Sequence, residues 1–187
     1  MQVHKKTRMR QMLVAAGAGL LLAQSLAYGH TYPTNKCLNP SPGDFFCEPD
    51  DKSHKYCLSG MTMGWPLQTA INYAHGTVVD MVQYADCPTW IDVQFKSETT
   101  GGNNLGEYFC QAFNSAGECE RALLRVDPWK TINMSQGDVA LIWLHEIGHS
   151  LGLSHADGAA MQNPLGTYAN NFFYSAHQRS TDLPKIQ

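Results

Sequence analysis

Charged residues make up only 16% of this 187-residue chain, and its apolar runs fall short of the roughly 20 residues that span a membrane as a helix. The sequence also lacks internal repeats, low-complexity tracts and any Cys-x-x-Cys pair, which argues against a zinc site built from cysteine. With 43% hydrophobic residues, the composition excludes a disordered chain, a collagen-like repeat and a coiled coil. A folded, globular protein is therefore expected.

The first 29 residues are typical of a secretory signal peptide. An uncharged apolar run of 11 residues, Met12 to Leu22, follows a basic start made of Lys5, Lys6, Arg8 and Arg10. The tripeptide Ala27-Tyr28-Gly29 is a small-x-small cleavage site, and Ser25-Leu26-Ala27 is an alternative. We expect residues 1–29 to be removed and residues 30–187 to form a single domain that is secreted or periplasmic.

Removal of this segment leaves an acidic protein. Four of the 13 basic residues lie within residues 1–29 and none of the 16 acidic ones do, so nine basic and 16 acidic residues remain, with a net charge of −7. Such a chain has neither the basic footprint of a nucleic-acid-binding protein nor a polybasic membrane patch. We expect no nucleic-acid partner and no membrane attachment after cleavage.

All six cysteines lie after residue 29, at Cys37, Cys47, Cys57, Cys87, Cys110 and Cys119. An even number in an exported chain predicts up to three disulfides, with 15 possible pairings. Cys110 and Cys119 flank a short loop and form the preferred local pair. Residues 30–60 are rich in Pro, Asp, Lys, Ser and Cys and show little periodicity, which indicates an irregular segment held by disulfides.

Hydrophobic periodicity places four elements on the rest of the chain. Residues 66–85 carry apolar residues at helical spacing and predict a long helix. Alternation over residues 90–95 and the apolar run at 122–126 predict two strands, with a loop at residues 101–104 between them. Ser135 begins a Ser-x-x-Asp capping sequence, and the apolar spacing after it predicts a second helix that ends near Leu151, before Gly152.

The predicted second helix carries the motif that indicates the chemistry of the protein. His145 and His149 are four residues apart, so both imidazoles lie on one face and can bind a single Zn²⁺ ion. Gly152 allows a sharp turn out of the helix, after which His155 can return to the same metal. Three imidazoles with one open position are typical of a catalytic zinc site rather than a structural one.

Glu146 follows the first ligand and can reach a metal-bound water without ligating the metal. Zinc lowers the pKa of its water and polarises a carbonyl, and Glu146 is the expected general base. The sequence thus predicts a zinc-dependent endopeptidase, a monomer acting on a peptide or protein substrate. The alternative is a disulfide-stabilised secreted binding protein with a vestigial or structural zinc site.

The run from His145 to His155, HEIGHSLGLSH, resembles the metzincin clan of zinc endopeptidases and is particularly similar to the matrixins. The resemblance implies an α+β fold in which a twisted, mostly parallel sheet packs on a long helix. An active-site helix would lie beneath, with a cleft between two unequal lobes. It also implies that Met161 forms the Met-turn, a hydrophobic floor under the metal. Matrixins differ at two points, since Ala156 follows the third His here and the Met-turn reads Ala-Ala-Met-Gln-Asn-Pro.

Other residues admit competing interpretations. Cys37 resembles the inhibitory cysteine of matrixin propeptides, although the even cysteine count favours a disulfide. His30, as a new N-terminus, could chelate copper but has no partner histidine of matching spacing. The Gly101–Glu107 loop could bind Ca²⁺ but lacks a calcium-loop signature.

Several remaining histidines and tyrosines are weaker candidates. His54, His75 and His177 have no ligand spacing to the motif, so surface or hydrogen-bonded positions are expected for them. Tyr168 and Tyr174 could stabilise an oxyanion, but such tyrosines more often line a pocket or pack in the core.

Overall fold

A computed structural model of the chain describes residues 50–51, 53–60, 64–76, 79–153, 155, 160–161, 173–174 and 179. The predicted signal peptide, Cys37, Cys47, His30, Tyr168 and His177 lie outside these residues. None of the described helices has the length and apolar character needed to cross a membrane.

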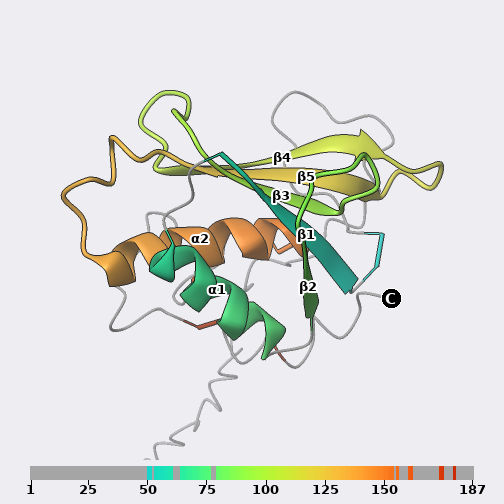
Figure 1. Cartoon of the computed structure of the whole chain (residues 1–187), viewed down its shortest axis with the longest axis horizontal. Helices are drawn as coiled ribbons and strands as arrows, with labels where there is room; N and C mark the ends of the chain where they lie inside the picture. The colour runs from blue at the N-terminus through green and yellow to red at the C-terminus, as the bar shows by residue number, and fades with distance from the viewer. Residues whose placement is uncertain are drawn as a thin grey trace, which may run out of the picture.

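Five strands form one sheet, in the order β2-β1-β3-β5-β4 (Figure 1). Their bounds are β1 Ser53–Ser59, β2 Asp80–Tyr84, β3 Val93–Ser97, β4 Gly106–Phe113 and β5 Cys119–Val126. The pairs β1–β2, β1–β3 and β3–β5 are parallel, and only β4 runs antiparallel to its neighbour β5. The expectation of an α+β fold with a mostly parallel sheet is thereby confirmed.

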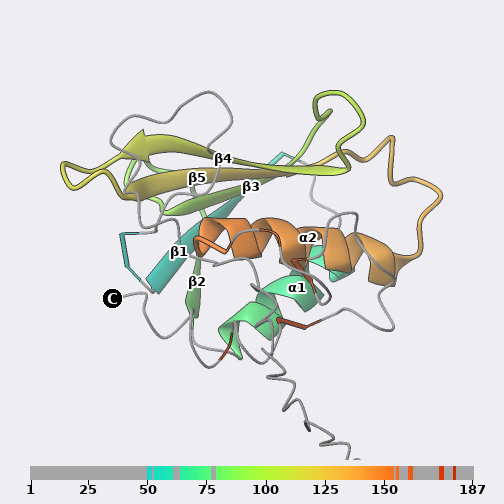
Figure 2. The ribbon, with the colours of Figure 1, turned by 180° about the vertical axis from the view of Figure 1, so that it is seen from behind.

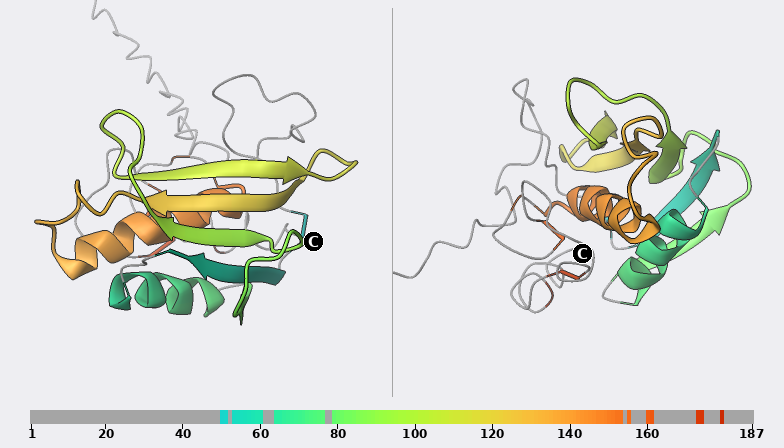
Figure 3. Two further views of the ribbon diagram at one scale, coloured as in Figure 1. Left: turned by 45° about the horizontal axis from the view of Figure 1, so that its top comes forward. Right: turned by 90° about the vertical axis from the view of Figure 1, so that its left-hand side faces the viewer.

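Two helices, α1 (Trp65–His75) and α2 (Gln136–Ser150), lie on the same face of this sheet and pack against each other (Figures 1 and 3). Seen from behind, α2 runs directly beneath β3, β4 and β5 (Figure 2). The ring of Trp143 on α2 meets that of Phe95 on β3 edge to face, 5.7 Å between centroids, and both side chains are fully buried. This contact fixes the middle of α2 against the sheet.

Helix α2 begins and ends where the sequence predicts. The Ser135 hydroxyl accepts a hydrogen bond from the Asp138 backbone N–H at 3.1 Å, which satisfies one of the free donors of the first turn. At the other end Gly152 takes a positive φ of 78°, and the Leu153 N–H bonds to the Gly148 carbonyl at 2.9 Å. Only glycine adopts this conformation without steric cost, so the turn after the helix depends on it.

The helix predicted over residues 66–85 is wrong in its second half. Helix α1 ends at His75, with Gly76 as its C-cap, and the chain continues into strand β2. Met81 is buried while the other residues of β2 are exposed, and the His75 Nδ1 accepts a hydrogen bond from the Met81 N–H at 3.1 Å. The β-branched Thr-Val-Val run after Gly76 favours a strand, and its valines also happen to fit a helical spacing.

Besides β2, strands β1 and β4 were not predicted, and the two predicted strands were found with shifted ends. Strand β1 falls within residues 30–60, which were expected to be irregular, and β4 follows the predicted loop at 101–104. Strand β3 covers residues 93–97 rather than 90–95, yet Ile91, Val93 and Phe95 are all buried as the alternation indicates. Strand β5 extends the predicted 122–126 back to Cys119.

Two disulfides join the described cysteines. Cys110 pairs with Cys119 across the hairpin of β4 and β5, as predicted. Cys57 on β1 pairs with Cys87, which lies after β2. These bonds are compatible with an extracellular or periplasmic protein, because such compartments preserve disulfides.

The Ser135 cap leads to a first prediction. Ser135→Ala should lower the free energy of unfolding by about 1 kcal/mol, because a donor of the first turn of α2 loses its partner. Urea denaturation measures this change. Ser115→Ala, at an exposed position in the β4–β5 hairpin, is the matched control and should change stability by less than about 0.5 kcal/mol. Equal losses in the two variants would contradict the capping role.

Candidate metal centre

The three histidines of the motif come together at the C-terminal end of α2. The Nε2 atoms of His145 and His149 are 3.0 Å apart, and those of His145 and His155 are 3.2 Å apart. The three candidate ligand atoms all lie within 4.8 Å of one another. His145 and His149 are buried, whereas His155 is exposed. The turn at Gly152 thus returns the third imidazole to the first two.

Backbone carbonyls orient the two buried imidazoles from behind. The Nδ1 atom of His145 lies 2.7 Å from the Ala160 oxygen, and that of His149 lies 2.8 Å from the Leu153 oxygen. A carbonyl oxygen only accepts, so both Nδ1 atoms must carry the hydrogen. The Nε2 atoms are then the unprotonated, lone-pair-bearing nitrogens of these rings.

This donor set fits a metal ion. Two unprotonated Nε2 atoms 3.0 Å apart have no hydrogen to share, so their lone pairs repel unless a cation lies between them. Nitrogen ligands about 2.1 Å from a tetrahedral zinc ion lie about 3.4 Å from one another, close to the separations found here. The cluster can therefore hold a metal ion, and three neutral nitrogen ligands suit Zn²⁺.

Burial keeps these imidazoles neutral. Desolvation lowers the pKa of His145 to about 4 and that of His149 well below its usual value, with the neighbouring histidines adding to the effect. Desolvation also lowers the pKa of the more exposed His155. A metal ligand must be unprotonated, so the folded chain presents this site in its binding form at neutral pH.

Glu146 is buried on α2, and its side chain faces strand β4. Its carboxylate lies close against the backbone of Gly106, the first residue of β4, where an added Cβ atom would be 2.5 Å from Glu146 Oε1. Burial, with a smaller contribution from Glu107, raises the pKa of Glu146 to about 8. A dication at the neighbouring imidazoles would favour the charged form and lower that pKa.

Met161 packs against α2 next to the histidine cluster. It is fully buried, and a Cβ atom at Gly148 would overlap its sulfur atom, so the thioether fills the space that the glycine leaves open. Tyr174 also lies against this glycine, with its ring 3.2 Å from such a Cβ. The Tyr174 hydroxyl donates to the Leu144 carbonyl at 2.9 Å in the core, so this tyrosine serves packing and not oxyanion binding.

Sequence reasoning missed two parts of this centre. The buried ring of Tyr108 on β4 lies 6.3 Å from that of His149, centroid to centroid, and closes one side of the cluster. The carbonyls of Leu153 and Ala160 that orient the imidazoles also went unnoticed. Backbone oxygens carry no sequence signal, and Tyr108 lies on a strand that the hydrophobic pattern does not reveal.

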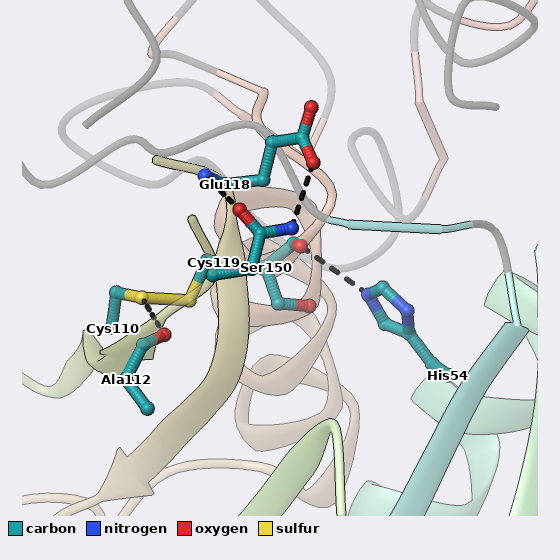
Figure 4. The surroundings of a disulfide bond; sticks show 7 residues. His54, Cys110, Ala112, Glu118, Cys119 and Ser150 are labelled. Carbon is teal, nitrogen blue, oxygen red and sulfur yellow. Dashed lines mark hydrogen bonds between the residues drawn. A yellow bond between two sulfur atoms is a disulfide. The ribbon is translucent and has the colours of Figure 1, made fainter. Parts of the chain in front are cut away.

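His54 ties the end of α2 to the sheet, in agreement with the expectation that it is a hydrogen-bonded histidine. Its ring on β1 is buried, and its Nε2 lies 3.3 Å from the carbonyl oxygen of Ser150 (Figure 4). Its Nδ1 finds no hydrogen-bond partner within the described parts of the chain. Burial lowers the pKa of His54 to about 4. His75, by contrast, lies near the surface and accepts the bond from Met81.

His54 gives the fold a defined acid sensitivity. A histidine with a folded pKa near 4 stays neutral while the unfolded chain takes up a proton below about pH 6.5, so stability is lost as the pH falls through that window. At pH 5 the loss from this group alone is about 2 kcal/mol. His54→Phe should therefore flatten the pH dependence by about that amount.

Urea unfolding of the metal-free protein at about pH 7 and about pH 5 tests this expectation, since removal of metal separates His54 from the ligand histidines. The variant can be less stable overall, because the Ser150 carbonyl loses its partner, without affecting the comparison. Equal losses on acidification in the wild type and the variant would show that His54 is not responsible.

No protein-family model matches the sequence, and no curated protein matches it. Among solved structures, two of myroilysin are similar, each at 14% identity, with TM-scores of 0.39 and 0.38. They cover 59% and 58% of this chain, and the matched parts are 52% and 47% of those chains, so this chain spans about half their length.

Proposed function

We propose that this protein is a secreted zinc endopeptidase in which His145, His149 and His155 hold one Zn²⁺ ion and Glu146 is the general base. The observation that carries the proposal is the convergence of three histidine ligand atoms, with a buried glutamate directly after the first of these histidines on α2. Two of these rings are oriented by backbone carbonyls, which is the arrangement that supports ligation through Nε2.

The donor set supports a catalytic ion. A structural zinc site is closed by four protein ligands, whereas the described residues bring three histidines together. When bound, zinc in such a site polarises a carbonyl group and lowers the pKa of a water molecule toward neutrality. The imidazoles contribute no charge of their own, so the full positive charge of the ion acts on the reacting groups.

Glu146 moves the proton. Its carboxylate is held between α2 and the backbone of Gly106, next to the first metal ligand along the helix. From there it accepts a proton from the attacking water and donates it to the departing amine. The low exposure of Glu146 keeps competing solvent away from that carboxylate and strengthens its interaction with charges in the site.

Strand β4 supports a peptide as the substrate class. It is an edge strand of the sheet among the described residues, and it starts against the Glu146 carboxylate. An edge strand offers backbone donors and acceptors with which an extended peptide can pair. A peptide bound along β4 would therefore pass close to the proposed general base.

The finer points of this proposal come from the metzincin resemblance. We assign Met161 to the floor beneath the metal, in agreement with its burial against Gly148. We also propose a matrixin-like subtype, two lobes around a cleft, and a monomeric domain over residues 30–187 that follows a cleaved signal peptide.

Replacement of the general base is the central test. Glu146→Gln keeps the size of the side chain but removes the proton acceptor, so peptidase turnover should fall by about 10²–10⁴-fold while zinc content stays unchanged. Hydrolysis of casein or gelatin, with and without a chelator, measures the activity, and elemental analysis measures the zinc.

Glu120→Gln, at an exposed position on β5, is the matched control and should retain wild-type activity. A Glu146→Gln variant as active as the wild type would overturn the mechanism. A wild-type protein that binds zinc but cleaves no member of a broad peptide library would support the binding-protein alternative.

The ligand assignment makes a separate prediction about metal content. The folded wild type should bind one zinc ion per chain, and alanine at either buried ligand, His145 or His149, should reduce zinc affinity by more than 100-fold, because an ion held by two nitrogens loses most of its binding energy. Elemental analysis after dialysis against a zinc buffer measures the stoichiometry. Retention of wild-type affinity in both variants would contradict the assignment.

A further inference from the structure

The ammonium group of Lys130 is enclosed by four oxygen atoms next to the carboxyl end of strand β5. Its Nζ donates to the Thr100 carbonyl at 3.0 Å, the Thr100 hydroxyl at 2.9 Å and the Asn104 carbonyl at 3.0 Å. The Asp127 Oδ2 lies 3.4 Å away. An ammonium has three N–H groups, so the three hydrogen bonds use all of them. We call these four oxygens the oxygen cage.

The carboxylate of the cage is rigidly held. Asp127 follows β5, and its side chain is almost fully buried. Its Oδ2 accepts from the Thr100 N–H at 3.0 Å, and its Oδ1 accepts from the N–H groups of Trp129 and Lys130 at 2.9 and 3.2 Å. Burial acts to raise the pKa of Asp127, but these donors outweigh it and lower the pKa to about 2. The cage therefore keeps a permanent, buried negative charge.

The other charged groups nearby already have hydrogen-bond or ion-pair partners. The Glu107 Oε1 accepts from the Gly101 N–H at 2.6 Å and from the Asn104 side-chain amide at 3.2 Å, and its Oε2 pairs with Arg125. Lys130 is thus the cation that the Asp127 carboxylate contacts among the described residues. A buried carboxylate without a cation is costly, so this pairing should stabilise the loop.

The chemistry of the cage is that of a hard-cation site. Two backbone carbonyls, a hydroxyl and a carboxylate are the oxygen ligands that Ca²⁺ takes in proteins. From the sequence alone, the Gly101–Glu107 loop could bind calcium but lacks a calcium-loop signature. The cage takes Asn104 from that loop, adds Thr100 and Asp127 from outside it, and has a lysine ammonium at its centre. A lysine ammonium in this position supplies a single positive charge without any metal.

We propose that Thr100, Asn104 and Asp127 form a cation site whose resident cation is the Lys130 ammonium, and that removal of this ammonium opens the site to Ca²⁺. The loop between β3 and β4 is then fixed by the chain's own side chain rather than by a metal. This inference does not rest on the peptidase function, because none of the three clustered histidines contributes an oxygen or a charge to the oxygen cage.

The cage positions the start of strand β4. The loop that it organises and the connection from β5 to α2 lie at the same end of the molecule (Figures 1 and 2). The Asp127 N–H also bonds to the Leu105 carbonyl at 2.9 Å, one residue before β4 begins. Loss of the Lys130 ammonium should therefore loosen the loop and the first residues of β4 together.

Lys130→Ala tests the proposal in a buffer that keeps the protein saturated with zinc. The variant should melt about 5–10 °C below the wild type without calcium, because Asp127 loses its cation. Millimolar Ca²⁺ should recover much of this difference in the variant and should not shift the wild type. Tb³⁺, excited through the neighbouring Trp129, should show saturable, calcium-competed luminescence in the variant only.

Lys96→Ala is the matched control, since Lys96 pairs with Glu98 at a partly exposed position and should gain no calcium response. Two outcomes would overturn the proposal. One is a wild type that binds calcium in competition with Tb³⁺ and loses this binding in Asp127→Asn. The other is a Lys130→Ala variant that is destabilised but binds neither ion.

A measurement on the wild type keeps the proposal testable if the variant does not fold. Reductive methylation followed by peptide mapping compares the reactivity of each lysine. Lys130, with all three N–H groups donated, should be methylated several-fold more slowly than Lys96. Equal rates at the two positions would show that the ammonium does not reside in the cage.

Discussion

The metal centre depends on two hydrogen bonds that point away from it. The Nδ1–H groups of His145 and His149 donate to the carbonyls of Ala160 and Leu153, which fixes the tautomer and the rotation of both rings. Without these bonds either nitrogen could carry the proton, and the Nε2 atoms would not be held 3.0 Å apart. The chain after α2 therefore provides both the third imidazole and the acceptors that aim the other two.

The burial of α2 on all sides makes this arrangement possible. Every residue from Val139 to Ser150 is buried, between the sheet on one face and α1 and Met161 on others. A helix enclosed in this way needs apolar residues around its whole circumference, and polar groups survive only where partners exist. Gly148 allows Met161 to approach, and the Trp143–Phe95 contact sets the depth of the helix beneath the sheet.

Much of the centre could be predicted because its parts are close together in the sequence. The capped helix from Ser135, the turn at Gly152 and the grouping of three histidines follow from spacing within some twenty residues. Strands β1 and β4 could not be predicted in the same way. His54 and Lys55 interrupt the apolar pattern of β1, although His54 is buried against Ser150 by a contact that only the folded chain creates.

The helix predicted over residues 66–85 extends past the observed end of α1 for a related reason. Val78, Met81 and Val82 continue the helical spacing in the sequence. Only Gly76, where the helix ends, and the β-branched residues after it indicate that a strand follows. The contacts of Lys130 could not be predicted from the sequence either, since they join residues about 30 positions apart through backbone carbonyls. Long-range pairings and main-chain acceptors thus account for most of what the sequence alone could not show.

The three imidazoles differ in their access to solvent, since His145 and His149 are buried and His155 is exposed. An ion bound here would exchange with bulk water through the side that His155 covers. The ion would then lose its bond to His155 first and would stay bound to His145 and His149 alone. Capture would run in reverse, so the exposed imidazole of His155 would control how long the ion stays bound.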